Sequence, residues 1–269
     1  WYTVERTPQA FHEAAERVVA RGYRGLKFDP FGNGDMELSR EEYRRAMELV
    51  EAVSSAAGAD VQIFIEMHGR FSISQAIEIC KDLEKYNPGF VEEPCRPLDV
   101  GALEYVMRHT TVPIAAGERL YLASAYNEVF RRRAVRIVQP DISQCGGLLE
   151  VKKICSAAEP LSIMAAPHNV GGIIATMANV HLMATLRNGK ILEHFNDFSD
   201  SYVKNVGAPY PEVTDGYFHL PDGPGWGVEV DLDFLKEHEA EMVDGVIQDP
   251  GLNMYRSTSW NLRSKKADI

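Results

Sequence analysis

The 269-residue sequence has few cysteines and no long apolar run, and each absence excludes a class of protein. Its four cysteines show no CxxC spacing and are too few for a disulfide scaffold in a chain of this length. No apolar stretch approaches the roughly 18 to 20 residues of a membrane span, and no signal-peptide pattern opens the chain. We therefore expect a cytoplasmic protein with reduced, structural cysteines and no membrane partner.

Basic residues are also in the minority. The chain has 28 Lys and Arg against 39 Asp and Glu, a formal net charge of -11, and no basic run longer than Arg131 to Arg133. Nucleic acids and anionic membranes attract basic surfaces, so this balance disfavours both as partners. A small-molecule substrate is the better expectation, and the 45% of hydrophobic residues suffices for one large core.

Short β-type runs alternate with amphipathic segments over the first two thirds of the chain, which is typical of parallel βα units. The expected strands are residues 25–28, 61–65, 89–91, 112–116, 135–138, 161–165 and 190–192. The expected helices are residues 7–20, 39–56, 72–86, 100–108, 124–132, 147–158 and 172–186.

Polar residues end these runs at nearly regular intervals, mostly 23 to 27 residues apart. They are Tyr2, Lys27 with Asp29, Glu66 with His68, Glu92, Glu118, Asp141, His168 and Glu193. Eight such ends predict a (β/α)8 TIM-type barrel of the α/β class, whose active site lies at the carboxyl ends of the strands. A doubly wound sheet would usually have fewer units and a glycine-rich phosphate loop, for which Gly32-Asn-Gly34 is too short.

The domain organisation follows from the same count. Residues 1–195 are expected to form the barrel, and residues 196–269 a loop-rich tail that completes it and packs on it, with a helix at 231–243. Because Tyr2 marks the end of the first strand, we expect the body of that strand to lie upstream, which makes this a barrel with a truncated first strand.

Glu66, Glu92 and Glu118 end three consecutive expected strands at spacings of 26 and 26. A single Glu after a strand is usually a solvated loop residue, but three in register would converge and repel one another unless a cation lay between them. Hard oxygen ligands without cysteine favour Mg²⁺, with Mn²⁺ next, and argue against structural zinc. The sequence therefore predicts a metal site.

Asp141 and His168 follow neighbouring buried strands at the same height. A carboxylate beside an imidazole fixes its tautomer and raises its proton affinity, which suits a general base. A lone His is more often a structural residue, but the Asp one strand earlier favours His168 as the base and Asp141 as the residue that orients it.

At this point the sequence resembles the enolase superfamily, in particular its mandelate racemase-like group. The resemblance rests on segments from the first residues to about residue 195, in matching order and spacing. They are Lys27-Phe-Asp29, Glu66-Met-His68-Gly-Arg70, Val91-Glu-Glu-Pro94, Gly117-Glu-Arg119, Gln139-Pro-Asp141, Ala166-Pro-His168 and Leu192-Glu-His194. It implies abstraction of a proton α to a carboxylate, with the enediolate held on Mg²⁺, which is the chemistry typical of this superfamily.

The resemblance also implies roles for individual residues. The three glutamates match the metal ligands, although many members have Asp where this chain has Glu66. Glu193 matches an acid that, when protonated, hydrogen-bonds a substrate carboxylate oxygen. Lys27 would lie near that carboxylate and stabilise the enediolate. Racemases of the group carry a second lysine as a base on the other face, and Asp29 occupies its place here.

His68 resembles the general acid of acid-sugar dehydratases in this group, and period-two alternation would place it on the same side of the strand as Glu66. One base, one acid and a metal support loss of water from a polyhydroxy carboxylate. Asp29, Arg70 and Tyr2 are the expected substrate contacts, although surface ion pairing accounts equally well for Arg70. Arg119 is a candidate partner of Glu118.

The leading hypothesis is thus a Mg²⁺-dependent sugar-acid dehydratase that releases a 2-keto-3-deoxy acid. A cycloisomerase of a sugar-acid lactone or anhydro sugar would use the same first intermediate, and a non-catalytic sugar-acid binder would be expected to lack part of the dyad or trio. We further expect a homo-oligomer, and an N-terminal capping domain, absent from this sequence, that the active site needs.

Overall fold

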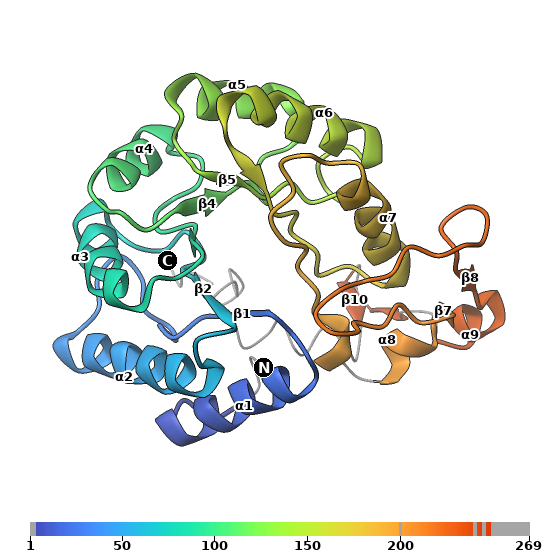
Figure 1. Cartoon of the computed structure of the whole chain (residues 1–269), viewed down its shortest axis with the longest axis horizontal. Coiled ribbons are helices and arrows are strands. Elements are labelled where there is room, and N and C mark those ends of the chain that lie inside the picture. The colour runs from blue at the N-terminus through green and yellow to red at the C-terminus, as the bar shows by residue number, and fades with distance from the viewer. Residues whose placement is uncertain (1–3, 199–200, 239–240, 244–245, 249–269) are drawn as a thin grey trace.

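The computed structural model describes residues 4–198, 201–238, 241–243 and 246–248. Its centre is a sheet of six parallel strands in chain order, curled inside an arc of helices (Figure 1). The strands of this sheet are β1 (Gly25–Phe28), β2 (Gln62–Glu66), β3 (Val91–Glu92), β4 (Ile114–Ala116), β5 (Ile137–Val138) and β6 (Met164–Ala165). These elements confirm a parallel α/β architecture of the barrel type, seen here as an open, curled sheet.

Seven helices surround this sheet, and they agree with the expected helical segments to within two or three residues at most ends. They are α1 (Pro8–Ala20), α2 (Arg40–Ala57), α3 (Ile73–Leu83), α4 (Val100–Arg108), α5 (Leu122–Arg132), α6 (Leu148–Ala158) and α7 (Ile173–Ala184). Four begin at a capping side chain that accepts a backbone N–H three residues later, which satisfies an otherwise unpaired donor. The caps are Thr7, Ser39, Ser72 and Asp99.

The core lies between the sheet and the helices. Phe28, Ile65 and Val91 on the strands are fully buried, as is Leu49 on α2. Burial of a side chain of this size contributes about 1.5 to 3 kcal/mol relative to exposure. The register pairs Ile65 with Val91 and Glu66 with Glu92, so the packed strands deliver two glutamates side by side.

The expected strand at residues 190–192 is wrong in detail. Among the described residues, this part of the chain joins the sheet only through a single bridge between Gly189 and Ala165, with backbone bonds from Ala165 N to Asn188 O and from Lys190 N to Ala165 O. One bridge is too short for a ladder, although it continues the parallel order beyond β6. The first expected strand end, Tyr2, lies outside the described residues, so the complete count of eight strands stays a prediction.

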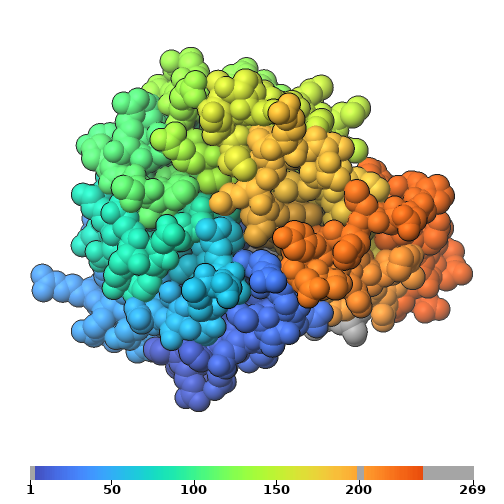
Figure 2. Space-filling view, in the orientation of Figure 1, coloured from blue at the N-terminus to red at the C-terminus, as the bar shows by residue number. Residues whose placement is uncertain are grey.

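The described part of the tail packs beside α7 and α1 (Figures 1 and 2). It contains α8 (Ser201–Asn205), the antiparallel pair β7 (Gly207–Ala208) and β8 (Glu229–Val230), α9 (Leu232–Glu237), and the antiparallel pair β9 (Glu241–Val243) and β10 (Val246–Gln248). The helix expected at 231–243 is therefore wrong in extent, because its last residues pair as β9. No helix among the described residues has the length and apolar character needed to cross a bilayer.

Buried polar contacts attach the tail to the rest of the fold. Asp197 accepts hydrogen bonds from Arg21 at 2.9 Å, from the Tyr23 hydroxyl at 2.7 Å and from the Tyr210 hydroxyl at 3.1 Å. These contacts join the turn after α1 to the segment after Glu193. The predicted division at residue 195 stays a prediction, since tail and barrel share this network.

Candidate active site

Three glutamates meet where β2, β3 and β4 end. One carboxylate oxygen each of Glu66, Glu92 and Glu118 lies within 4.8 Å of the other two. Glu66 and Glu92 end their strands, and Glu118 follows β4 after Gly117. Gly117 has φ 151°, and a Cβ there would lie 2.9 Å from the Gln139 nitrogen, so only glycine lets the chain pass β5 closely enough to present Glu118.

The environment of Glu92 indicates where a cation would bind. Its Oε2 accepts hydrogen bonds from Lys27 Nζ at 2.6 Å and Gln139 Nε2 at 2.7 Å. Its Oε1 is buried and has no hydrogen-bond partner among the described residues. Burial, together with repulsion from Glu92 and Glu66, raises the pKa of Glu118 to about 9 despite the opposing charge of His168. A buried, unpaired oxygen and crowded carboxylates fit a divalent cation with oxygen ligands.

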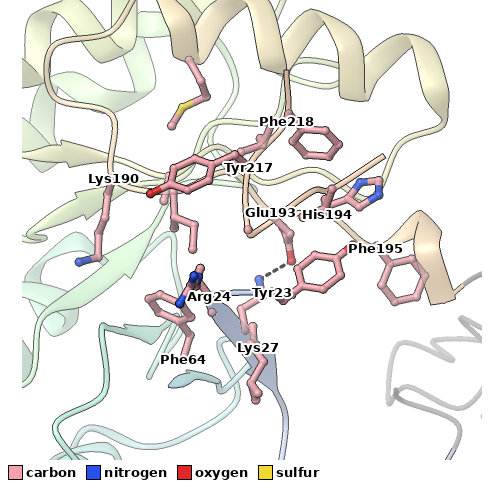
Figure 3. Close-up of a pocket in the computed structure, with 18 of the residues that line it drawn as sticks. Tyr23, Arg24, Lys27, Phe64, Lys190, Glu193, His194, Phe195, Tyr217 and Phe218 are labelled. Atoms are coloured by element: carbon pink, nitrogen blue, oxygen red, sulfur yellow. Dashed lines mark ion pairs between the residues drawn. The ribbon is translucent and has the colours of Figure 1, made fainter. Parts of the chain in front are cut away.

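Lys27 lies among the carboxylates on the side of Glu193. Its Nζ is 2.7 Å from Glu193 Oε1 (Figure 3). The same Nζ lies 3.4 Å from Glu66 Oε2. Burial opposes the charge of Glu193, but Lys27 and His168 outweigh it and lower its pKa. The geometry therefore pairs Glu193 with Lys27, and the predicted role of Glu193 as an acid toward a substrate carboxylate stays a prediction.

His168 and Asp141 form the predicted pair. His168 Nδ1 is 2.6 Å from Asp141 Oδ2, and His168 Nε2 is 3.4 Å from Glu118 Oε2. Burial lowers the proton affinity of the ring, but the bond to Asp141 and the charges of Glu193 and Glu118 dominate and raise the pKa of His168 to about 9. The ring thus presents Nε2 to the glutamate cluster while Asp141 holds Nδ1.

A second Asp–His pair lies beside Glu66. His68 Nδ1 is 2.7 Å from Asp29 Oδ2, and Arg70 binds the same oxygen at 2.6 Å. Burial opposes the charge of His68, but Glu66 and Asp29 outweigh it and raise its pKa. The Asp29 and Arg70 side chains are only 11% and 6% exposed, so both are occupied by protein partners. Their predicted contact with substrate stays a prediction.

His68 reaches the site by a turn. Strand β2 ends at Glu66, so alternation does not extend to His68, which has φ 50° in the left-handed region. Its backbone N–H donates to Glu66 Oε1 at 2.6 Å. A non-glycine residue in this region is uncommon and is often held there by functional constraints.

A cavity of about 490 Å³ adjoins the polar cluster (Figure 3). Lys27, Glu193 and Gln139 line one part of it, and Phe64 and Tyr217 belong to its largely apolar remainder. Its volume suits a small molecule. Neither histidine pair nor Glu66 or Glu118 lines it, however, so the carboxylate cluster and not the cavity is the chemical centre.

Sequence reasoning missed several supporting residues. Gln139, two positions before Asp141, hydrogen-bonds Glu92, and the Asn169 backbone N–H donates to Glu193 Oε2 at 3.0 Å. Gln139 stands two positions before Asp141, and Asn169 directly follows His168. This closeness in sequence to predicted site residues was the signal that could have identified them. Arg119, the candidate partner of Glu118, lies 2.8 Å from it and also contacts the buried Glu93. The remaining predicted contact, Tyr2, lies outside the described residues.

Comparison with known proteins adds to this geometry. Residues 10–234 match the family model described as "Enolase C-terminal domain-like". The chain is 38% identical over 242 residues to D-gluconate dehydratase of Thermoproteus tenax, covering 90% of this chain and 48% of that protein. It is 33% identical over 238 residues to D-gluconate/D-galactonate dehydratase of Picrophilus torridus, covering 88% and 60%. The chain thus spans about half to three fifths of these relatives.

A solved structure agrees with the computed fold. The mandelate racemase/muconate lactonizing enzyme-like protein from Rubrobacter xylanophilus superimposes with a TM-score of 0.82 at 33% identity, covering 90% of this chain and 64% of that one. The similarity therefore extends over nearly all of the present chain.

Proposed function

The chain belongs to the enolase superfamily, in its mandelate racemase-like group, and from this premise we propose that it carries the catalytic residues of a metal-dependent sugar-acid dehydratase. The proposed substrate is an aldonic acid related to gluconate or galactonate, by analogy with the dehydratases it resembles. The single observation that carries the proposal is that one Asp–His pair lies at each end of the glutamate trio.

The trio would hold Mg²⁺, with Mn²⁺ as the second choice, through oxygens of Glu66, Glu92 and Glu118. A divalent cation bound there supplies Lewis acidity that stabilises negative charge on a substrate carboxylate. Lys27, already within 2.6 to 3.4 Å of three carboxylates, adds a fixed positive charge beside the same place.

In the first step His168 accepts the α-proton of the substrate at Nε2. Asp141 holds Nδ1–H, so the basic nitrogen is directed at the cluster. The electron pair of the broken C–H bond moves into the substrate carboxylate, giving an enediolate whose charge Lys27 stabilises. Glu193, bound to Lys27, holds the ammonium group in position.

In the second step the enediolate expels the β-hydroxyl group. His68 donates a proton to that oxygen as the C–O bond breaks, and water leaves. The resulting enol becomes the 2-keto-3-deoxy acid, while His168 releases its proton to solvent and His68 regains one. The net change is loss of one water, without any oxidant or reductant.

The test is turnover of a stereochemically complete panel of aldonic and aldaric acids with Mg²⁺, followed by product mass. A product lighter by one water, with a 2-keto group, is the expected result. A product of unchanged mass and altered retention would instead identify a cycloisomerase. Absence of both water loss and α-deuterium exchange from D₂O with every acid would overturn the enzyme proposal.

A further inference from the structure

Asp29 and Asp141 are built into the site in the same way. Each accepts the backbone N–H two residues ahead through Oδ1, from Phe31 at 2.8 Å and from Ser143 at 2.6 Å. Each binds a histidine Nδ1 through Oδ2, at 2.7 Å for Asp29 and 2.6 Å for Asp141. A side chain fixed by its own turn is a rigid platform for the imidazole it holds.

Arg70 ties the Asp29 platform to the turn that carries His68. Its Nε donates to Met67 O at 3.1 Å, its NH2 group donates to Asp29 Oδ2 at 2.6 Å, and its NH1 group donates to Gly32 O. The guanidinium thus joins the loop after β1 to the loop after β2. Such a clamp sets the distance between Asp29 and the imidazole of His68.

We propose that Asp29 is a positioning residue for His68, not a substrate contact or a proton-transferring group. This inference rests on the proposed dehydratase function. By accepting a hydrogen bond from Nδ1–H, Asp29 selects the ring orientation in which Nε2 delivers the proton to the departing hydroxyl. The site therefore holds two oriented histidines, one for each proton transfer.

The proposal separates the two chemical steps. Loss of Asp29 disturbs only the residue that protonates the leaving group, so α-proton removal by His168 continues and the intermediate returns to substrate. In D₂O, Asp29→Asn should therefore keep α-deuterium exchange within about 3-fold of wild type while elimination falls on the order of 10- to 100-fold, as is usual when the partner that orients a functional histidine is lost.

A substrate with fluoride in place of the β-hydroxyl group gives an independent readout. Fluoride leaves without full protonation, so Asp29→Asn should eliminate it at close to the wild-type rate. Asp35→Asn is the matched control, since Asp35 lies in the same loop, is 58% exposed and pairs with Arg96 at 3.2 Å. Equal losses of exchange, water elimination and fluoride elimination in Asp29→Asn would overturn the proposal, because they would indicate a merely structural role.

Removing a buried carboxylate leaves Arg70 without its counter-charge, so the double variant Asp29→Asn with Arg70→Gln serves as a second test if the single variant does not fold. The double variant is also expected to retain α-deuterium exchange and fluoride elimination while losing water elimination. If wild-type protein neither exchanges nor eliminates any sugar acid, the proposed function fails by itself. The ¹⁵N spectrum of His68 at alkaline pH then decides the positioning role: the Nδ1–H tautomer is expected in wild type, and its unchanged dominance in Asp29→Asn overturns the proposal.

Discussion

The two ends of the glutamate trio carry the same Asp–His pair in different surroundings. At the Glu118 end, Asp141 has a backbone N–H and Gln144 as its further partners, the latter at a long 3.4 Å. At the Glu66 end, Asp29 shares its Oδ2 with Arg70 at 2.6 Å. The Asp141 carboxylate thus has His168 as its one cationic partner among these contacts, whereas the Asp29 carboxylate interacts with both His68 and the Arg70 guanidinium.

This difference fits the two roles proposed for the pairs. An undivided carboxylate charge raises proton affinity most, which suits the proposed base His168. A divided charge still orients the ring but favours its protonated form less, which suits a residue that must release a proton. Arg70 indeed lowers the proton affinity of His68, against the larger contributions of Glu66 and Asp29.

The largest difference between the two pairs is expected when His168, the proposed base, is substituted. His168→Gln should lower both α-deuterium exchange and elimination by about 100- to 10,000-fold, because both steps need proton removal. The same change at His68 should spare exchange. ¹H NMR in D₂O measures exchange, and product assays measure elimination. His12→Gln, at a histidine on α1 that pairs with Glu16, is the control and should change neither. Exchange at the wild-type rate in His168→Gln would show that the base is another group.

Removing the central ligand tests the trio that the two pairs share. Glu92→Gln should weaken Mg²⁺ binding by at least about 100-fold, more than the usual loss of a supporting partner, because it removes one of three negative charges and replaces one carboxylate oxygen by an amide nitrogen that does not bind a cation. Titration calorimetry provides the measurement. Glu41→Gln, in the first turn of α2, is the matched control. Wild-type affinity in Glu92→Gln would place the cation elsewhere.

Cation binding should change the pKa of His168. Glu193 and Glu118 help raise the pKa of His168 to about 9, and a bound cation would offset the charge of Glu118, so this pKa should fall when Mg²⁺ is added. A lower pKa leaves more neutral base near pH 7. NMR titration of His168 with and without Mg²⁺ measures the change, and a pKa that rises on addition of Mg²⁺ would contradict the assigned geometry.

Much of the fold could be predicted because its signals are local. Ser39 and Ser72 mark helix starts, and apolar runs followed by Glu66 and Glu92 mark strand ends. Ile191 and Leu192 have the same apolar character, yet a single bridge at Gly189 replaces a ladder there. Whether a β-type run pairs depends on backbone neighbours that lie far away in sequence.

The clustering of the candidate residues was predictable from the sequence, but their individual contacts were less so. Periodicity placed the trio together, whereas His68 reaches it through a left-handed turn that alternation does not describe. The ion pair of Arg70 with Asp29 spans 41 residues, and Lys27 meets Glu193 across the whole sheet. Such pairings depend on the three-dimensional approach of loops, and two short motifs cannot specify them.

Stability should also differ between the two pairs. Arg70→Gln removes the buried partner of Asp29 and should lower the free energy of unfolding by about 3 kcal/mol, near the lower end for a broken buried ion pair, because His68 still compensates the carboxylate. Urea unfolding monitored by circular dichroism measures this. Arg44→Gln, at an exposed arginine of α2 that lies 3.9 Å from Glu48, should cost less than about 1 kcal/mol. Equal costs would show that the Asp29 clamp is no stronger than a surface pair.

The equivalent change at the other pair should have the smallest effect. Gln144 Nε2 reaches Asp141 Oδ2 only at 3.4 Å, near the limit of a hydrogen bond, while the Ser143 N–H and His168 already satisfy the carboxylate. Gln144→Ala should therefore lower the free energy of unfolding by less than about 1 kcal/mol, since a typical neutral hydrogen bond contributes about that much. Exchange and elimination should keep their wild-type ratio. A loss of unfolding free energy as large as that of Arg70→Gln would mean that Asp141 also depends on a neighbouring side chain to hold it. The two pairs would then differ in the charges around each aspartate and not in how firmly each aspartate is held.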